Sequence, residues 1–251
     1  MLDLFSLKGK VALFTGGNRG LGKAMAIGLA KAGADVAVVG RKHDQAVIDA
    51  IEACGVRGKF FIHDLENIEA IPDLVKAVKA QFGHIDILVN NAGVQSRHKA
   101  VDFPKKDWDF VLNVNMNAPF FLCQEVGRLM LEQGKGKIIN IASLLSFQGG
   151  VTVPAYAASK GAVAQFTKAL SNEWAGQGVN VNCITPGYMD TEMNVALMAD
   201  QTRSTQILAR IPAGRWGKPE DMVGAVIYLA SSASDYVSGS NLVVDGGWMG
   251  R

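Results

Sequence analysis

The apolar residues of the chain fall into short, nearly continuous runs. Seven runs have the length of strands: 10–15, 35–40, 59–64, 86–91, 137–143, 179–187 and 241–247. Strands with one face in water alternate apolar and polar residues, whereas strands of a parallel sheet, buried on both faces, are apolar throughout. The pattern therefore predicts a parallel sheet covered on both sides.

Longer segments between these runs carry apolar residues at helical spacing, most clearly at 20–32, 67–82, 107–133 and 155–176. Strands that alternate with helices predict an α/β fold, a Rossmann-type doubly wound sheet with right-handed crossovers and helices on both faces. No linker, low-complexity tract or long-period repeat interrupts this order. We therefore expect residues 1–251 to form a single dinucleotide-binding domain.

The segment 188–214 departs from this alternation. It is helical in pattern, rich in methionine, and lies between the end of a strand and "RIPAGRWGKPED". A long excursion after the carboxyl end of a strand is placed to cover the ligand crevice of such a sheet. We expect a helical substrate lid over about 188–214.

Composition and charge exclude several classes of protein. The 251 residues are 49% apolar and 19% charged, as in a globular domain, and the net charge is only +2. No block of like charges indicates nucleic acid or a membrane surface as partner. No apolar window reaches the roughly 18 residues of a membrane span, and the N-terminus does not resemble a signal peptide.

The cysteines and histidines predict no metal site. Three cysteines lie far apart without a C-x-x-C pair, and the four histidines lack the spacing of metal ligands. An odd number of separated cysteines is typical of reduced thiols. We therefore expect a cytoplasmic protein without disulfides.

The first strand leads directly into "TGGNRGLG" (15–22) and then into a helix. Its glycines follow a G-x-x-x-G-x-G spacing related to the dinucleotide fingerprint, which permits a tight turn and a close approach of a pyrophosphate to a helix N-terminus. The G-K-[ST] element of phosphate-binding NTPases is absent. The predicted cofactor contacts in this loop are Gly16, Asn18, Arg19, Gly20, Leu21 and Gly22.

The end of the second strand indicates which dinucleotide is bound. An acidic residue there would bind the ribose hydroxyls of NAD, but the strand ends in "VVGRK", and Asp35 lies at its opposite end. Arg41 and Arg19 could hold a 2′-phosphate, because guanidinium groups bind phosphate in two-pronged fashion. The alternative is that both are solvated surface side chains. These residues favour NADP(H) over NAD(H).

Further candidate cofactor residues follow the third and fourth strands, at the edge of the sheet where ligands of this fold bind. In "HDL", Asp64 could accept a hydrogen bond from the adenine amino group. In "NNAG" (90–93), small residues would let the cofactor lie against the backbone. The predicted contacts here are Asp64, Leu65, Asn91, Ala92 and Gly93.

A tyrosine and a lysine stand four residues apart in "VPAYAASKGAV" (153–163). On a helix, Tyr156 and Lys160 share one face, with Cβ atoms roughly 6 Å apart. A phenol with a pKa of about 10 barely ionises near neutrality, and an adjacent ammonium lowers that pKa. A lone Y-x-x-x-K pair more often means two unrelated surface residues, so its meaning depends on the other motifs.

Six motifs in order resemble the short-chain dehydrogenase/reductase family. They are T-G-x-x-x-G-x-G, N-N-A-G, Asn115 in a long helix, Ser143 at the end of the fifth strand, Y-x-x-x-K, and P-G at 186–187. The match extends over nearly the whole chain. The resemblance implies hydride transfer between NAD(P)(H) and a secondary alcohol or ketone.

The resemblance also implies roles for single residues. Tyr156 would be the general acid/base, Lys160 would lower its pKa and bind the nicotinamide ribose, and Ser143 would bind the substrate oxygen. Asn115 would hold a water that connects Lys160 with solvent. The implied contacts with the nicotinamide end are Tyr156, Lys160, Pro186, Gly187, Met189 and Thr191. For Met189, core packing is the alternative.

Residues 136–251 are similar to the sugar-acid dehydrogenases of this family, which implies a substrate such as 2-dehydro-3-deoxy-D-gluconate and self-association as a homotetramer. Arg97 is the leading candidate for binding its carboxylate, Arg203 and Arg251 are weaker ones, and Ser146 and Gln148 are further substrate contacts. Arg97 could instead tie its loop to an acid such as Asp102, and Ser146 could instead cap a loop.

Three other functions stay open: a gluconate 5-dehydrogenase, a reductase of 3-oxoacyl thioesters, and a non-catalytic dinucleotide-binding protein. The thioester reductase that acts on a carrier protein would need a basic docking patch, for which only Lys99, Lys105 and Lys106 qualify. A binding protein would not need the tyrosine–lysine pair.

Overall fold

The seven predicted apolar runs form one parallel sheet in the computed structural model, which describes residues 2–251. The strands are β1 (Val11–Thr15), β2 (Asp35–Gly40), β3 (Gly58–Ile62), β4 (Ile87–Asn90), β5 (Gly136–Ile141), β6 (Val179–Pro186) and β7 (Asn241–Val244). Their spatial order is β3-β2-β1-β4-β5-β6-β7, and each neighbouring pair is parallel. The predicted doubly wound fold is confirmed, with strand ends displaced by at most three residues.

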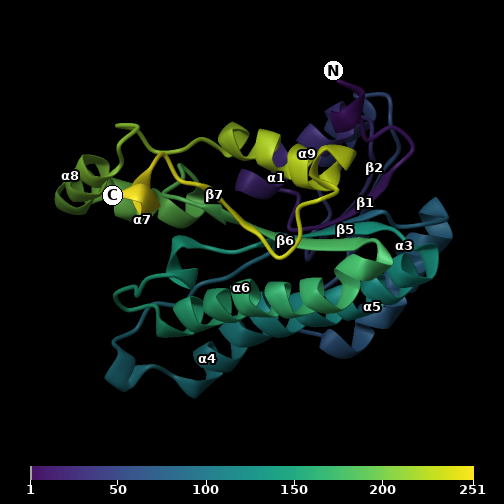
Figure 1. Cartoon of the computed structure of the whole chain (residues 1–251). Coiled ribbons are helices and arrows are strands. Elements are labelled where there is room, and N and C mark those ends of the chain that lie inside the picture. Colours follow the sequence, from purple (N-terminus) through teal and green to yellow (C-terminus); the bar gives the residue numbers. More distant parts are fainter. Residues whose placement is uncertain (1) are drawn as a thin grey trace.

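Helices cover both faces of this sheet (Figure 1). One face carries α1 (Gly20–Lys31), α2 (Gln45–Glu52) and α9 (Val223–Ala230), and the other carries α3 (Ile71–Phe82), α4 (Lys105–Leu112), α5 (Ala118–Gln133) and α6 (Pro154–Trp174). The short helices α2 and α9 are additions to the helical segments that the sequence pattern showed most clearly. None of the helices in residues 2–251 combines the length and the apolar content that a membrane crossing requires.

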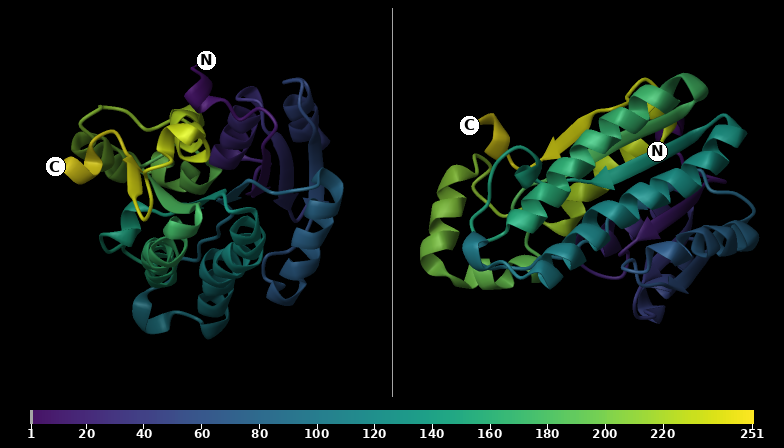
Figure 2. Two further views of the ribbon diagram at one scale, coloured as in Figure 1. Left: turned by 45° about the vertical axis from the view of Figure 1, so that its right-hand side comes forward. Right: turned by 90° about the horizontal axis from the view of Figure 1, so that it is seen from below.

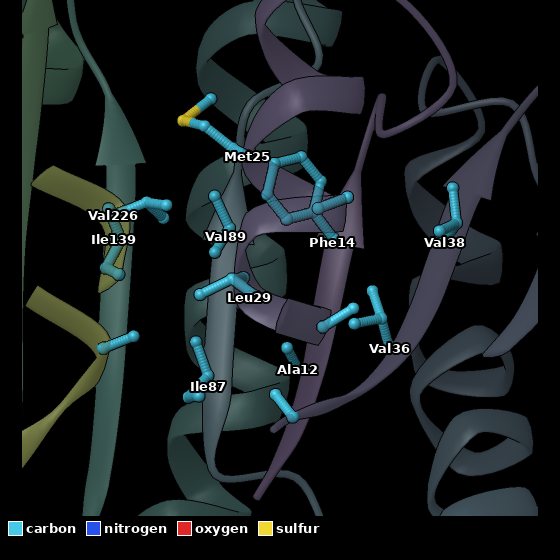
Figure 3. Packing of buried hydrophobic residues seen from close by; sticks show 14 of the residues in the cluster. Ala12, Phe14, Met25, Leu29, Val36, Val38, Ile87, Val89, Ile139 and Val226 are labelled. Atoms are coloured by element: carbon cyan, nitrogen blue, oxygen red, sulfur yellow. The ribbon is translucent and has the colours of Figure 1, made fainter. Parts of the chain in front are cut away.

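The core explains why the strands are apolar throughout. Along β1, Ala12 and Phe14 pack toward α1 and α9, whereas Val11 and Leu13 pack toward α3 and α5. Figure 3 shows the first of these layers, with the Phe14 ring between neighbouring strands and α1. Burying one side chain of this size is worth roughly 1.5–3 kcal/mol, so a polar residue at either set of positions would be costly.

The predicted helix over 107–133 is divided in two. A π-helical turn, Asn113–Asn117, separates α4 from α5, and the Ala118 N–H bonds the Asn113 carbonyl. Pro119 follows and has no N–H to donate to the carbonyl of Asn115 four residues earlier, which favours this irregular turn. The division therefore places Asn115 on a local distortion next to the site described below.

The lid segment is helical, as predicted. It contains α7 (Val195–Ala199) and α8 (Gln201–Arg210), which stand beyond the end of the sheet beside the C-terminus (Figures 1 and 2). Asp200 begins α8 by accepting a hydrogen bond from the Arg203 N–H at 3.1 Å. The lid and the C-terminal turn thus occupy one end of the molecule.

Candidate active site

The glycine loop joins β1 to α1 through backbone that side chains would obstruct. Gly16 has a φ of +68°, and a Cβ added to Gly22 would lie 2.0 Å from the Gly16 carbonyl oxygen. A Cβ at Gly20 would meet only Thr191, at 3.8 Å, so the space above the loop is open. No side chain caps the N-terminus of α1. Its first N–H groups are therefore available to a pyrophosphate, and the loop fits a dinucleotide.

Asn91 holds this loop in place. Its Nδ2 atom donates to the carbonyls of Thr15 at 3.1 Å and Gly16 at 3.0 Å. The Thr15 hydroxyl accepts from the N–H groups of Asn91 at 3.0 Å and Ala92 at 3.1 Å. The Asn91 side chain is thus occupied with the protein backbone, and only the backbone of this predicted cofactor residue is left for a ligand. The sequence motifs alone indicate neither these hydrogen bonds of Asn91 nor the role of Thr15.

The adenosine end of the predicted site lies at β2 and β3. Asn18 stands beside Gly40, since its Oδ1 atom is 3.5 Å from the position of a Cβ there, and Arg41 is exposed at the end of β2. Asp64 is also exposed, with one oxygen accepting from the Glu66 N–H at 3.1 Å. Leu65 packs into the core, which leaves only its backbone for a ligand.

Lys160 is buried beneath Tyr156. The Lys160 Nζ atom lies 5.8 Å from the centre of the Tyr156 ring and donates to the Ile141 carbonyl at 2.5 Å. Burial lowers the pKa of Lys160 to about 8, and the Cys183 thiol opposes this shift. Burial raises the pKa of the Tyr156 hydroxyl, and the Ser143 side chain lowers it. Ser143, Tyr156 and Lys160, the three predicted catalytic side chains named above, are thus brought together at the carboxyl end of β5.

Asn115 is fully buried by the same group of residues. Its Oδ1 atom accepts from the Val94 N–H and its Nδ2 atom donates to the Val94 carbonyl, both at 2.8 Å, with Ser159 Oγ at 3.3 Å from Nδ2. The side chain therefore fixes the backbone after "NNAG" beside Gly93. Any water held here would use the backbone carbonyl of Asn115, which Pro119 leaves without its usual donor.

The loop after β5 is internally capped by its second serine. Ser146 Oγ accepts from the Ser143 N–H at 3.3 Å and donates to the Lys160 carbonyl at 2.7 Å. These bonds match the loop-capping alternative for Ser146. Ser143 Oγ accepts from the Leu145 N–H at 3.1 Å, and Gln148 is half-buried on the same loop.

Arg97 is exposed on the loop that follows β4 and forms no ion pair within the described chain. Its Nε and Nη2 atoms both lie 2.8 Å from the side-chain oxygen of Gln95 in the amide orientation that satisfies both groups. Burial, and next the charge of Arg203, lowers the pKa of Arg97. The alternative contact with Asp102 does not form. The sequence analysis missed Gln95 as the support of this guanidinium.

The last predicted cofactor residues line the start of the lid segment. The Gly187 N–H bonds Val244 at 2.9 Å, directly after Pro186. Met189 is buried in the core, which matches its alternative reading, whereas Thr191 faces Gly20 across the open space. Next to Thr191, Glu192 pairs with Arg19 at 3.4 Å, so Arg19 connects the glycine loop to the lid. Among residues 2–251, no group of three or more His, Cys, Asp and Glu side chains could hold a metal ion.

Comparison with known proteins agrees with this geometry. Residues 10–202 match the short chain dehydrogenase family. The 2-dehydro-3-deoxy-D-gluconate 5-dehydrogenase of Escherichia coli (strain K12) is 51% identical over 252 residues, covering 100% of both chains. The protein of that name from Bacillus subtilis (strain 168) is also 51% identical, covering 99% of this chain and 98% of its own.

A solved structure is similar throughout. The gluconate 5-dehydrogenase of Burkholderia cenocepacia J2315, in complex with NADP and tartrate, superimposes with a TM-score of 0.96 at 40% identity, covering 100% of this chain and 99% of that one. The chain therefore belongs to the short-chain dehydrogenase family. It is an NAD(P)-dependent oxidoreductase that acts on a CH–OH group, and the expected similarity to sugar-acid members is confirmed.

Proposed function

We propose that this oxidoreductase interconverts the secondary alcohol and the ketone of a sugar acid, with 2-dehydro-3-deoxy-D-gluconate as the principal candidate substrate. The observation that carries the proposal is the position of Arg97. A guanidinium without an acidic partner stands on the loop between the glycine motif and Asn115, and the relatives' names specify acidic substrates. A carboxylate is the group that such a side chain binds best, because the pair can be bidentate.

Tyr156 exchanges a proton with the reacting oxygen in this proposal. When bound, the nicotinamide cofactor supplies or accepts the hydride. Ser143 donates to the substrate oxygen and also lowers the pKa of Tyr156. Lys160 supplies a positive charge below the phenol, which favours the phenolate in the oxidative direction. Arg97 orients the carbon chain by its carboxylate end.

The proposed cofactor contacts are those at the open space above the glycine loop. The Gly20, Leu21 and Gly22 N–H groups hold the pyrophosphate, and Thr191 meets the nicotinamide end. In this proposal Arg41, with Asn18 beside it, binds the 2′-phosphate of NADP(H), whereas Arg19, the second cation predicted for that phosphate, is paired with Glu192. For Asp64, a hydrogen bond to the adenine amino group remains our proposal.

We also propose a homotetramer in the cytoplasm. Exposed apolar side chains on two elements, such as Phe121 on α5 and Val243 on β7, give the chain surfaces to bury against further copies. All three cysteines are free thiols, which fits a reducing compartment. Light scattering of the purified protein tests the oligomer.

Absorbance at 340 nm tests the activity. 2-Dehydro-3-deoxygluconate is offered with NAD⁺ and with NADP⁺, because its secondary alcohol must be oxidised, whereas 5-ketogluconate and a 3-oxoacyl thioester are each offered with NADH and with NADPH. Turnover of a sugar acid supports the proposal, and the two acids separate the two sugar-acid functions. Reduction of the thioester alone would replace the proposal with that alternative.

A further inference from the structure

The orientation of α8 is set by its buried side chain. Ile207 is 8% exposed and packs with Leu144, the residue after Ser143, and with Trp248. Arg203 lies one turn before Ile207, so both side chains project from the same face of α8. The face of α8 that packs against the loop of Ser143 therefore also carries the exposed guanidinium of Arg203.

Arg97 stands on the loop after β4, which is held next to the segment that follows Ser143. The Nε2 atom of His98, the next residue, donates a hydrogen bond to the Asp107 carboxylate at 2.6 Å, and the His98 backbone N–H donates to the Thr152 carbonyl at 3.0 Å. With Gln95 bound to Nε and Nη2, the Nη1 side of the Arg97 guanidinium is left for a ligand. The loop therefore presents this charge in one orientation.

Arg97 and Arg203 stand on two elements that both pack against the segment 144–152, Arg97 beside the bond from the His98 N–H to Thr152 and Arg203 one turn before Ile207. Neither forms an ion pair with any carboxylate of residues 2–251, and Arg203 is near enough to lower the pKa of Arg97. Two like charges held together are unfavourable until an anion lies between them. An anionic ligand that binds both guanidinium groups would relieve this repulsion.

We propose that Arg203 is a specificity residue that binds the substrate carboxylate from the lid side, together with Arg97 from the loop side. The inference rests on the proposed function and names the part of the lid that recognises the acid. Since Arg203 belongs to α8 and Arg97 does not, a carboxylate bound by both holds the lid against the Ser143 loop. An uncharged substrate would lack this bond and would leave the lid free.

Kinetics of single and double variants test this carboxylate clamp, formed by Arg97 and Arg203. Arg203→Gln and Arg97→Gln should each lower kcat/KM for the sugar acid about 10-fold or more, mainly through KM, as expected for a charge-assisted hydrogen bond. The double variant should lose less than the product of the two, because both act on one group. Arg203→Lys, which keeps the charge but not the fork, should lie between. Arg128→Gln removes an equal charge on α5, which carries neither arginine of the clamp, and serves as the matched control.

The uncharged amide of the same acid separates recognition of charge from damage to the fold. Arg203→Gln should leave kcat/KM for the amide unchanged within twofold while lowering that for the acid. An equal loss for acid and amide, or no loss for either, would overturn the clamp.

A binding measurement keeps the clamp distinct from the proposed reaction. Titration calorimetry of the enzyme saturated with NADPH, in which a hydroxy acid cannot be oxidised, measures the affinity for tartrate. Tartrate binding that falls with Arg203→Gln and with Arg97→Gln supports the clamp even when no sugar acid is turned over. Tartrate binding that Arg203→Gln does not change would reject it, even when the sugar acid is a substrate.

Discussion

The Nζ atom of Lys160 lies 5.8 Å from the centre of the Tyr156 ring and is hydrogen-bonded to the Ile141 carbonyl instead of the phenol. The ammonium would therefore act on Tyr156 through space, by favouring the phenolate. Burial of the phenol works in the opposite sense and raises its pKa. The proton of Tyr156 is thus retained at neutral pH, where reduction of a ketone requires a proton donor, and we propose that the positive charge below assists the loss of this proton.

Tyr156→Phe should abolish this proton transfer and spare the fold. The variant loses one hydroxyl from a half-buried ring, so we expect turnover to fall about 10²-fold or more, the usual contribution of a general acid/base. Steady-state assays measure turnover. Quenching of protein fluorescence by NADPH measures cofactor affinity, which should stay within a few-fold of that of the parent. A variant that keeps near-normal turnover would remove Tyr156 from the mechanism.

The buried charge of Lys160 predicts how stability depends on pH. Its folded-state pKa of about 8 lies below the usual 10.5, so between these values the unfolded protein binds more protons. The contribution of Lys160 to the free energy of unfolding therefore increases as pH rises from about 8 to about 10.5. Over the whole range, the change is on the order of 3 kcal/mol.

Lys160→Met isolates this effect. Without cofactor, the variant should be more stable than the parent at pH 7, and the difference should narrow at pH 9 in urea titrations. The buried thiols Cys123 and Cys183, whose pKa values burial raises to about 12 and about 11, act in the opposite direction. Cys123 contributes equally in both proteins, whereas the Cys183 pKa should rise further in the variant, because the charge of Lys160 lowers it in the parent. If the free energies of unfolding of parent and variant depended on pH in the same way, the low pKa of Lys160 would be contradicted.

Gly22→Ala should disrupt the glycine loop. The new Cβ would lie 2.0 Å from the Gly16 carbonyl oxygen and 2.5 Å from Asn91 Nδ2, so the loop must move away from Asn91, which holds it in place. We expect NADPH affinity to fall at least 10-fold, and a loss of stability of about 1–3 kcal/mol from overpacking. Gly224→Ala on α9, where nothing lies within 4 Å, is the control and should be stabilising. Equal effects of the two substitutions would argue against a tight turn at Gly22.

Much of this fold could be predicted from the sequence because its signals are local. A strand buried on both faces is a run of apolar residues, and the loop between β1 and α1 is marked by glycines that no side chain can replace. Chemically special pairs such as Tyr156 and Lys160 are also local, one helical turn apart. The carboxyl ends of parallel strands then gather these motifs at one edge of the sheet.

The remaining features depend on contacts between distant segments. Nothing near Asn91 indicates that its amide is occupied by Thr15 and Gly16, and nothing near Arg203 indicates that Ile207 turns this helix toward Leu144. The π-helical turn at Asn115 depends on one proline within an otherwise regular pattern. Such relationships follow from packing, which single-residue patterns do not encode.

Arg41→Ala tests the choice of cofactor. Arg41 is exposed at the end of β2, beside Gly40 and Asn18, and no acidic residue occupies this strand end. Loss of a charge-assisted bond to a 2′-phosphate should raise KM for NADPH about 10-fold and leave KM for NADH within twofold. Kinetics with both reductants measure the change. A similar loss for both would show that Arg41 does not bind the 2′-phosphate.

Trp248 joins the C-terminal turn to the lid, and its truncation should loosen both. The ring is 5% exposed, packs with Leu144 and Ile207, and lies 3.9 Å below the Arg210 guanidinium. Trp248→Ala should cost about 3 kcal/mol through the cavity it leaves, and should raise both KM and the rate of proteolysis within α8.

Trp248→Phe is the informative control for this substitution. The indole Nε1 atom is buried without a hydrogen-bond partner in residues 2–251, so phenylalanine keeps most of the apolar contact and removes an unsatisfied donor. We therefore expect near-normal KM and proteolysis, measured by timed digestion and mass spectrometry of the fragments. If Trp248→Phe behaved like Trp248→Ala, the indole nitrogen would have a hydrogen-bond partner in the active protein. Apolar packing alone would then not explain how the C-terminal turn stabilises the lid.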